Sequence, residues 1–410
     1  MSQFIEKKIE RNRIIFVFTA ILIVYTAVFL TLTSSELTGD EKRYFSQATN
    51  LTKGFFIRQD RLWIDNGPGY PLLLALFVKS NIDLGWTKAI NPLLMTAAFW
   101  FAFATARLYV HDRYALMGTA LFAAYFPFFR DLGRLLSEPL ACVLISVWVY
   151  LTCKIWMKPR IRFVLIAGII FGYLCLTKVI FGYVLLLGIL GFGSWSLFNK
   201  RLRTRYMLAV FILAGAFCTP YLLHTNALTG KAFHWADMGA YNLYWMSSPY
   251  PNDSGDWHRI DEVFEVPQLT PHRDFFRTLR NTPFEHRSAL LVQAAIENIT
   301  EKPFKYIQNW VANLGRMAFN YPHDFTPLTN RTFFYILPNT VVILLFSSAL
   351  VMVRKYRIEV PLELFVIVAV GILVLGGISL LHANPRMVQP ILFILFVPML
   401  YGLTKGKTSN

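Results

Sequence analysis

The sequence predicts an all-α polytopic membrane protein with about ten transmembrane helices, and its composition carries that prediction. Of its 410 residues, 55% are hydrophobic and only 16% are charged, whereas soluble domains contain about 25% charged residues. The apolar residues gather in runs of about twenty, the length of helix that crosses a hydrocarbon core of roughly 30 Å. The apolar content and the four cysteines exclude a disordered chain and a disulfide-stapled secreted scaffold.

The first apolar run covers residues 14–33 and is expected to be a retained anchor, because no A-x-A-like cleavage site follows it. Nine further spans are expected along the rest of the chain, at residues 86–109, 114–130, 135–153, 161–177, 179–198, 206–223, 333–353, 361–381 and 387–404.

The excess of basic residues supplies the orientation. There are 40 Lys and Arg against 24 Asp and Glu, a formal net charge of +16, which on a soluble protein would suggest nucleic acid. With both termini in the cytoplasm, the inside segments hold nineteen basic and five acidic residues, as the positive-inside rule requires. We therefore expect no nucleic-acid partner, and the plasma (inner) membrane as the location if the source is bacterial. The short outside turns hold four basic residues, Arg130, Arg134, Lys178 and Arg386.

Two outside segments are too long to be simple connections. The first, residues 34–85, contains a stretch of helical periodicity at 40–54, expected as a helix on the membrane surface. It also contains an apolar stretch at 72–78 that is too short to span and is expected as a second surface helix or a re-entrant helix. The second, residues 224–332, is rich in aromatic, proline and charged residues. The chain is thus divided into an N-terminal transmembrane module (1–223), an extracytoplasmic segment (224–332) between spans seven and eight, and C-terminal transmembrane helices (333–410).

Ionisable residues recur where spans meet the outer surface. Each group alone has an ordinary interpretation, such as a helix cap at Asp40 and Glu41 or interfacial snorkelling by Arg130 and Arg134. Placed on one membrane face, however, the four outside cations suit a phosphate headgroup, and nearby carboxylates, including Glu138, suit deprotonation of a hydroxyl. Together they indicate group transfer from a lipid phosphate.

Four motifs follow one another along the chain. They are Gly39-Asp40-Glu41 with Tyr44, Ala48 and Gly54; Asn66-Gly67-Pro68-Gly69-Tyr70-Pro71-Leu72; Ser137-Glu138-Pro139-Leu140; and Arg386-x-x-x-Pro390 with Pro398. In this order the motifs resemble those of the polytopic GT-C glycosyltransferases, in the branch of protein mannosyltransferases and aminoarabinose transferases. Lys178 and Met387 depart from the family pattern, in which arginine and tyrosine are usual.

The resemblance implies a sugar donor on a polyprenyl monophosphate and transfer on the extracytoplasmic face with inversion. Asp40 would be the general base and Glu41 a second catalytic residue, or a residue that holds Asp40 or a basic partner in place. Glu138 would position a substrate hydroxyl or pair with Arg130 or Arg134. The remaining substrate-binding residues would be Lys178 and Arg386 on the phosphate, Arg130 or Arg134 as helpers, and Tyr70 and His382.

No cofactor is required by this scheme, although a divalent metal is possible because Asp40, Glu41 and Glu138 with His382 offer ligands. The acceptor is a glycan, a lipid or a protein, and residues 224–332 are expected to cover it. The alternative function is a polytopic transporter or flippase of lipid-linked sugars, which would normally place ionisable residues near mid-membrane. A purely structural assembly subunit would leave the acidic first loop unexplained.

Overall fold

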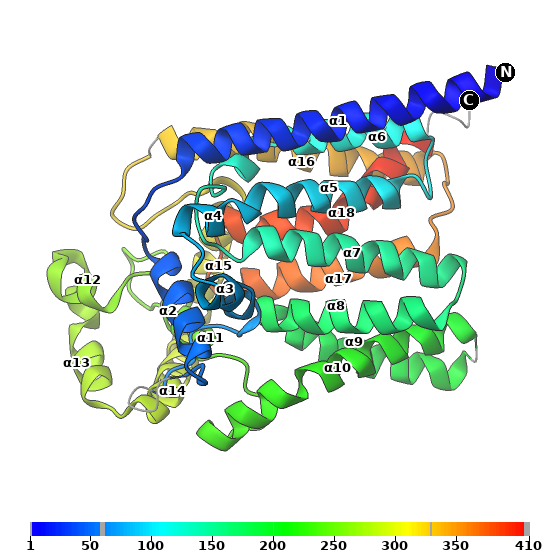
Figure 1. Ribbon diagram of the computed structural model, residues 1–410. Coiled ribbons are helices and arrows are strands. Elements are labelled where there is room, and N and C mark those ends of the chain that lie inside the picture. The colour runs from blue at the N-terminus through cyan, green and yellow to red at the C-terminus, as the bar shows by residue number, and fades with distance from the viewer. Residues whose placement is uncertain (1, 58–61, 200, 329, 406–410) are drawn as a thin grey trace.

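The computed structural model describes residues 2–57, 62–199, 201–328 and 330–405, and within these ranges the protein is helical without a β-strand. Lys200 and Lys407, two of the nineteen basic residues counted on the inside, lie outside the described residues. Most long helices run side by side in one bundle (Figure 1). They are α1 (Ser2–Leu32), α5 (Ile90–Ala106), α6 (Asp112–Ala123), α7 (Glu138–Met157), α8 (Ile161–Thr177), α9 (Ile180–Phe198), α10 (Leu202–Thr229), α16 (Asn330–Lys355), α17 (Leu362–Ser379) and α18 (Pro385–Lys405).

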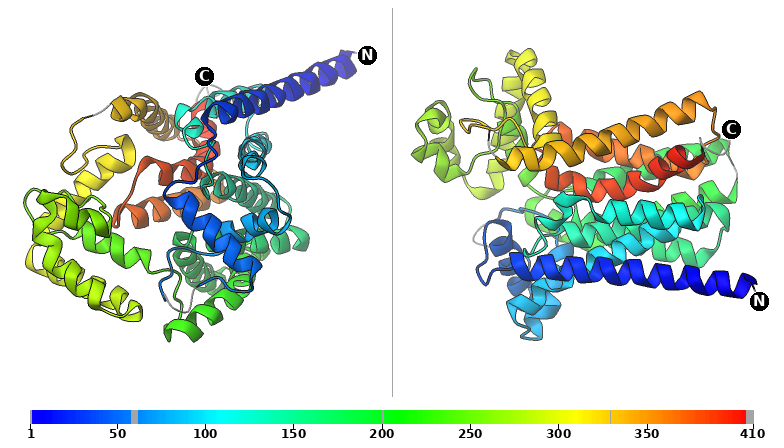
Figure 2. Two further views of the ribbon diagram at one scale, coloured as in Figure 1. Left: turned by 60° about the vertical axis from the view of Figure 1, so that its left-hand side comes forward. Right: turned by 90° about the horizontal axis from the view of Figure 1, so that it is seen from above.

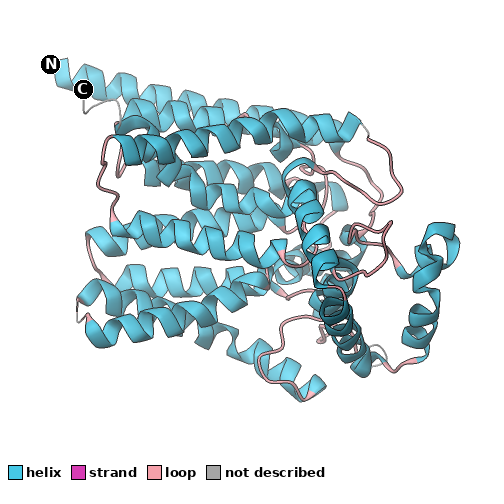
Figure 3. Ribbon diagram, turned by 180° about the vertical axis from the view of Figure 1, so that it is seen from behind, coloured by secondary structure: helices cyan, strands magenta, loops and turns pink. Residues whose placement is uncertain are grey.

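Eight helices of the described chain, rather than ten, are long and apolar enough to cross a membrane. The predicted span at 114–130 is the clearest difference, because α6 has only 12 residues and ends at Ala123. A short 3-10 helix, Phe126–Phe129, follows it. Pro127 in that turn cannot donate a backbone hydrogen bond and disfavours helix at the preceding residue. The predicted span at 161–177 forms as α8 but has 17 residues, about 25 Å of helix. Both helices nevertheless pack within the bundle (Figures 1 and 3).

The packing of α8 on α10 explains how this shorter helix is held. Gly168 and Gly172 form a G-x-x-x-G pair on the face of α8 that meets α10. A Cβ atom added at Gly168 would lie 2.6 Å from Cβ of Leu213, and one at Gly172 would lie 2.9 Å from Cβ of Phe217. The two glycines therefore let the helix backbones approach closely, which is how small residues promote helix association in membranes.

The remaining helices gather at one end of the bundle, opposite the start of α1 and the end of α18 (Figures 1 and 2). α2 occupies most of the predicted 40–54 stretch, and α3 begins three residues before the predicted 72–78 stretch. The second long segment has a core of its own, in which the rings of Trp245 and Phe276 stack with centroids 5.4 Å apart. The helices at this end are α2 (Asp40–Thr52), α3 (Gly69–Lys79), α4 (Leu84–Lys88), α11 (Met238–Met246), α12 (Ile260–Glu265), α13 (Arg273–Asn281), α14 (Phe284–Glu301) and α15 (Pro303–Phe319), with a second 3-10 helix at Pro267–His272.

Candidate active site

Asp40 is the first residue of α2, and its carboxylate lies between two arginines. Gly39 before it has φ 50°, a left-handed conformation that favours glycine, and this turn brings the start of α2 towards the bundle. Oδ2 of Asp40 accepts a hydrogen bond of 2.7 Å from Nη2 of Arg386, and Oδ1 lies 3.0 Å from Nη2 of Arg43, one turn along the same helix. The sequence analysis paired Arg386 with a phosphate, and it did not single out Arg43.

The charge of Asp40 is set by these neighbours. Burial by itself would raise the pKa of the carboxyl group, but Arg43, Arg386 and Lys178 outweigh burial and lower the pKa below its ordinary value. Asp40 is therefore an anion at neutral pH, the form that can accept a proton.

Glu138 connects Arg386 to Lys178. Its side chain, at the first residue of α7, is 4% exposed, and Oε1 lies 2.8 Å from Nζ of Lys178 and 3.2 Å from Nε of Arg386. The preceding residue, Ser137, shares a hydrogen bond of 3.2 Å with the hydroxyl of Tyr44. Of the two roles foreseen for Glu138, the structure places it in an ion pair, but with Lys178 and Arg386 instead of Arg130 or Arg134.

The two other outside arginines have different partners. Nη1 of Arg130 donates to the hydroxyl of Tyr335 on α16, and the Arg130 guanidinium carbon lies 5.6 Å from the Tyr335 ring centroid. Nε of Arg134 lies 3.5 Å from Oε2 of Glu41, and its Nη1 lies 3.5 Å from Oδ1 of Asp131. In this structure, therefore, neither arginine takes part in the Asp40–Arg386–Glu138–Lys178 cluster, called the charge cluster below.

Glu41 occupies a buried position beside the charge cluster. Its side chain is 2% exposed, and Oε1 lies 3.1 Å from Nζ of Lys88, itself 1% exposed. Glu41 also accepts hydrogen bonds from the backbone N–H of Leu135 (3.0 Å) and from the N–H and hydroxyl of Thr38 (3.2 and 3.0 Å). Burial would raise the pKa of Glu41, but the hydrogen bonds from Leu135, Lys88 and Thr38 lower it. These contacts match the alternative in which Glu41 holds a basic partner in place.

A cavity of about 800 Å³ opens beside the charge cluster. Lys178 lines it directly, together with Tyr44, Asn66 and His382, and side chains of α9 and α17 form apolar walls that include Leu187 and Leu373. Its composition, apolar walls with a few convergent polar groups, is typical of a ligand site.

Tyr70 does not line this cavity but packs against Tyr44, which does. Its side chain is fully buried, its ring packs edge-on against Tyr44 with centroids 5.0 Å apart, and its hydroxyl has no hydrogen-bond partner among the described residues. Tyr44, to which the sequence analysis gave no role in substrate binding, is the tyrosine that reaches the cavity wall.

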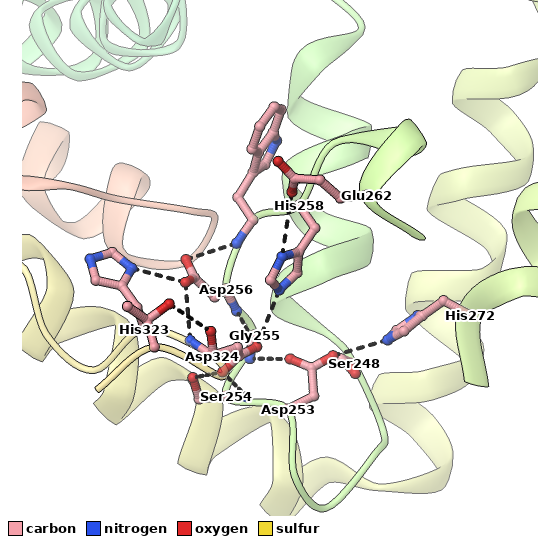
Figure 4. Close-up of polar contacts among 12 residues, drawn as sticks. Ser248, Asp253, Ser254, Gly255, Asp256, His258, Glu262, His272, His323 and Asp324 are labelled. Carbon is pink, nitrogen blue, oxygen red and sulfur yellow. Dashed lines mark hydrogen bonds and ion pairs between the residues drawn. The ribbon is translucent and has the colours of Figure 1, made fainter. Parts of the chain in front are cut away.

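His382 lines the cavity and lies beside a second polar cluster, in the segment between α10 and α16. Figure 4 shows the polar contacts of this cluster. Nδ1 of His382 lies 4.0 Å from Oδ1 of Asp256, and burial lowers the pKa of His382 to about 4, so this side chain is neutral at physiological pH. In the same cluster, Oδ2 of Asp256 lies 2.9 Å from Nδ1 of His323, and Asp324 accepts a 2.8 Å hydrogen bond from the backbone of Ser254. From the sequence, no role was assigned to any residue of this segment.

The buried face of α15 fastens this segment to the loop that precedes Arg386. Nδ2 of Asn313 donates to the carbonyl oxygens of Ser379 (2.8 Å) and Leu381 (2.7 Å), and Oδ1 accepts from the N–H of Ala383 (3.0 Å). Asn313 is fully buried, so these hydrogen bonds are shielded from water. One side chain thus fixes the backbone from which α18 and Arg386 begin, and no sequence motif pointed to it.

The described residues contain no group of three or more His, Cys, Asp and Glu side chains arranged to hold a metal ion. The four residues proposed above as ligands do not converge on one point: Asp40 and Glu138 bind Arg386, Glu41 pairs with Lys88, and His382 lies 4.0 Å from Asp256. We therefore derive no step through a metal.

Comparison with solved structures identifies the fold. The oligosaccharyltransferase of Archaeoglobus fulgidus in its apo form aligns with a TM-score of 0.51 at 12% identity, over 95% of this chain and 50% of that one. The same enzyme tethered to an acceptor peptide gives a TM-score of 0.50 at 13% identity, over 95% and 49%. ArnT from Cupriavidus metallidurans bound to undecaprenyl phosphate aligns at a TM-score of only 0.40 and 14% identity, over 96% and 78%, and we build nothing on it.

No protein-family model matches the sequence, and neither does any curated protein. This chain spans about half the length of the oligosaccharyltransferase. At this level of identity the likeness concerns the fold alone: this chain shares the helical arrangement of about half of the oligosaccharyltransferase.

Proposed function

We propose that this protein is a membrane glycosyltransferase that transfers a sugar from a polyprenyl monophosphate to an acceptor hydroxyl on the extracytoplasmic face. The observation that carries the proposal is the charge cluster beside a largely apolar cavity that one of its residues, Lys178, lines. Arg386 bridges Asp40 and Glu138, and Glu138 binds the Lys178 that lines the cavity. A prenyl chain suits the apolar walls, and a phosphate suits the two cations. Asp40 is a carboxylate close enough to both cations for them to lower its pKa.

The reaction is a single displacement. The acceptor oxygen forms a bond to the anomeric carbon, its proton passes to Asp40, and the bond from that carbon to the phosphate oxygen breaks. The polyprenyl phosphate leaves with the electron pair, from the face opposite the attack, so the anomeric configuration inverts. Lys178 and Arg386 stabilise the charge on the departing phosphate, a preorganised contribution that is worth several kcal/mol in sites of this kind.

The arrangement of Arg386 also explains how a carboxylate with a lowered pKa becomes an effective base. A phosphate bound by Lys178 and Arg386 competes with Asp40 and Glu138 for both cations. As the hydrogen bond from Arg386 to Asp40 weakens, the pKa of Asp40 rises towards the value useful in proton transfer. Binding of the donor phosphate would therefore raise the basicity of Asp40 in the complex from which the sugar is transferred.

The test is release of polyprenyl phosphate from labelled polyprenyl monophosphate sugars by the full chain in proteoliposomes. Asp40→Asn should lower the rate by about 10²–10⁴, the usual contribution of a general base. Asp112→Asn is the matched control, because Asp112 pairs with Arg107 outside the charge cluster.

Two outcomes would contradict the proposal. If Asp40→Asn transfers sugar at the wild-type rate, Asp40 is not the base. If lipid-linked sugar crosses the vesicle membrane without any transfer, the protein is a flippase.

A further inference from the structure

The two oxygens of Asp40 bind two different arginines, and the ion pairs that begin at them lead to two different cavities. Oδ2 binds Arg386, on the side of Glu138 and Lys178. Oδ1 binds Arg43, and Arg43 lines a separate cavity of about 420 Å³. In an inverting displacement the attacking hydroxyl and the leaving phosphate lie on opposite faces of the sugar. If the phosphate occupies the Lys178 side, the acceptor must approach from the side of Arg43.

The cavity beside Arg43 has a mixed lining, in which polar and charged side chains alternate with the aromatic rings of Phe56 and Trp63. α2 contributes Lys42, Gln47 and Asn50, and Trp63 and Asp65 close the opposite side. These side chains present both donors and acceptors of hydrogen bonds.

Trp63 and Asp65 also line a second cavity of about 220 Å³, on the other side of the tryptophan ring. Its further lining includes Tyr241 and Trp257, two aromatic side chains, and the charged residues Asp261 and Arg287. The two cavities therefore share a wall and form neighbouring subsites.

The shared wall is held rigidly. Nε1 of Trp63 donates to Oδ1 of Asp65 at 3.1 Å, which fixes the plane of the indole ring. The backbone between them is bound to Asp237, just before α11, by two hydrogen bonds: the N–H of Ile64 donates to Oδ2 of Asp237 (2.9 Å), and the N–H of Asp237 donates to the carbonyl of Ile64 (2.7 Å). An aromatic face fixed in this way is preorganised for a ligand.

The chemistry of these walls favours one acceptor class. A sugar ring has apolar C–H faces, which suit Trp63 and Trp257, and a rim of hydroxyl groups, which suits the amides and charged groups around them. A lipid acceptor would need continuous apolar walls, whereas charged side chains, among them Arg43, Asp65 and Asp261, interrupt the apolar surface of these cavities. A peptide bound by strand addition would need a sheet edge, which the described residues do not provide.

We propose that the acceptor is an oligosaccharide, with its terminal sugar in the cavity beside Arg43 and the preceding sugar across Trp63 in the second cavity. This inference rests on the proposed function and names its acceptor. The terminal hydroxyl is thereby presented to Oδ1 of Asp40, away from the Lys178 side.

The experiment measures binding to the full chain in nanodiscs with two probes. The first is an array of defined oligosaccharides, with a peptide library and lipid A in parallel, and the second is C55 polyprenyl phosphate. Trp63→Ala should weaken glycan binding at least about ten-fold and leave polyprenyl phosphate binding unchanged. Trp63→Phe, which keeps an aromatic face, should restore most of the affinity.

Trp86→Ala is the matched control, since Trp86 is 74% exposed and lines neither cavity, and it should bind both probes like the wild type. The acceptor inference fails if the wild type binds peptide or lipid A but no glycan, or if Trp63→Ala binds glycan as Trp86→Ala does. The proposed function fails instead if glycan is bound but polyprenyl phosphate is not.

Discussion

Replacing Glu41 by glutamine tests whether Glu41 has a structural role or a catalytic role. The substitution keeps the size of the side chain but removes its charge from beside Lys88, whose side chain is 1% exposed. It also places an NH₂ group where a carboxylate oxygen accepts hydrogen bonds. With the amide oxygen facing Leu135 and Lys88, the NH₂ group faces the N–H and hydroxyl of Thr38 and the guanidinium of Arg134.

The expected loss of stability follows from these contacts. Removing one partner of a buried ion pair costs about 3–5 kcal/mol. Lys88 keeps a hydrogen bond of 2.8 Å to the carbonyl of Ser34, so we expect the lower end of this range, about 3 kcal/mol. That loss lowers the folding equilibrium constant roughly a hundred-fold. In Glu41→Gln/Lys88→Met both charges are gone, and about 2 kcal/mol of the loss should be recovered.

The assay is reversible unfolding of the full chain in mixed SDS and dodecylmaltoside micelles, followed by tryptophan fluorescence, with the transfer rate measured on the same preparations. Glu36→Gln, at an exposed position of the same loop, is the control and should change neither quantity. The reasoning is refuted if Glu41→Gln keeps wild-type stability while each folded molecule loses transfer, because Glu41 would then act in catalysis directly. It is also refuted if adding Lys88→Met recovers no stability.

Three further predictions concern the charge cluster. The cationic neighbours of Asp40 lower the pKa of its carboxyl group below 3.8, so the carboxylate is present above that pH. The acidic limb of the plot of kcat/KM against pH should therefore lie below the ordinary Asp range. An acidic limb near pH 6 would contradict this prediction. Lys178→Met should weaken binding of polyprenyl phosphate at least ten-fold, whereas Lys178→Arg should retain it; equal binding by both variants would remove Lys178 from the phosphate site. Asn313→Ala removes three buried hydrogen bonds worth about 1 kcal/mol each. It should displace Arg386 and lower kcat more than it raises KM for the donor, and Asn313→Asp should recover at most part of the loss. An unchanged kcat in a destabilised Asn313→Ala protein would show that Asn313 is only structural.

The sequence was most informative about which ends of the helices meet. Hydrophobic runs and the positions of basic residues predicted that Asp40, Glu138, Lys178 and Arg386 would lie on one face, and the structure brings these four side chains into one cluster. Such patterns succeed because burying a charged residue in lipid is costly, so charges are confined to the ends of spans. The number of spans was predicted less well, because a proline turn shortens α6 without interrupting its apolar run.

Partners within that face could not be predicted in the same way. Arg130 and Arg134 had the same status in the sequence as Arg386, yet Arg130 binds Tyr335 on α16 and Arg134 binds Glu41. Arg386 reaches Glu138 because α18 packs against α7 in the bundle. The fold likewise brings Lys88, at the end of α4, next to Glu41 on α2. No residue spacing along the chain encodes these neighbours, which are separated by dozens to hundreds of residues.

The sequence by itself thus determined that the chain spans a membrane and that Asp40, Glu138, Lys178 and Arg386 lie at the same end of its helices, because hydrophobic length and charge are local properties that the bilayer reads directly. Tertiary structure alone decided which cation meets which carboxylate, which tyrosine reaches the cavity, and that Asn313 holds the loop before Arg386. Those choices depend on the order in which helices pack around one another. That order is fixed by shape and close approach, as at Gly168 and Gly172, rather than by the hydropathy of any one segment.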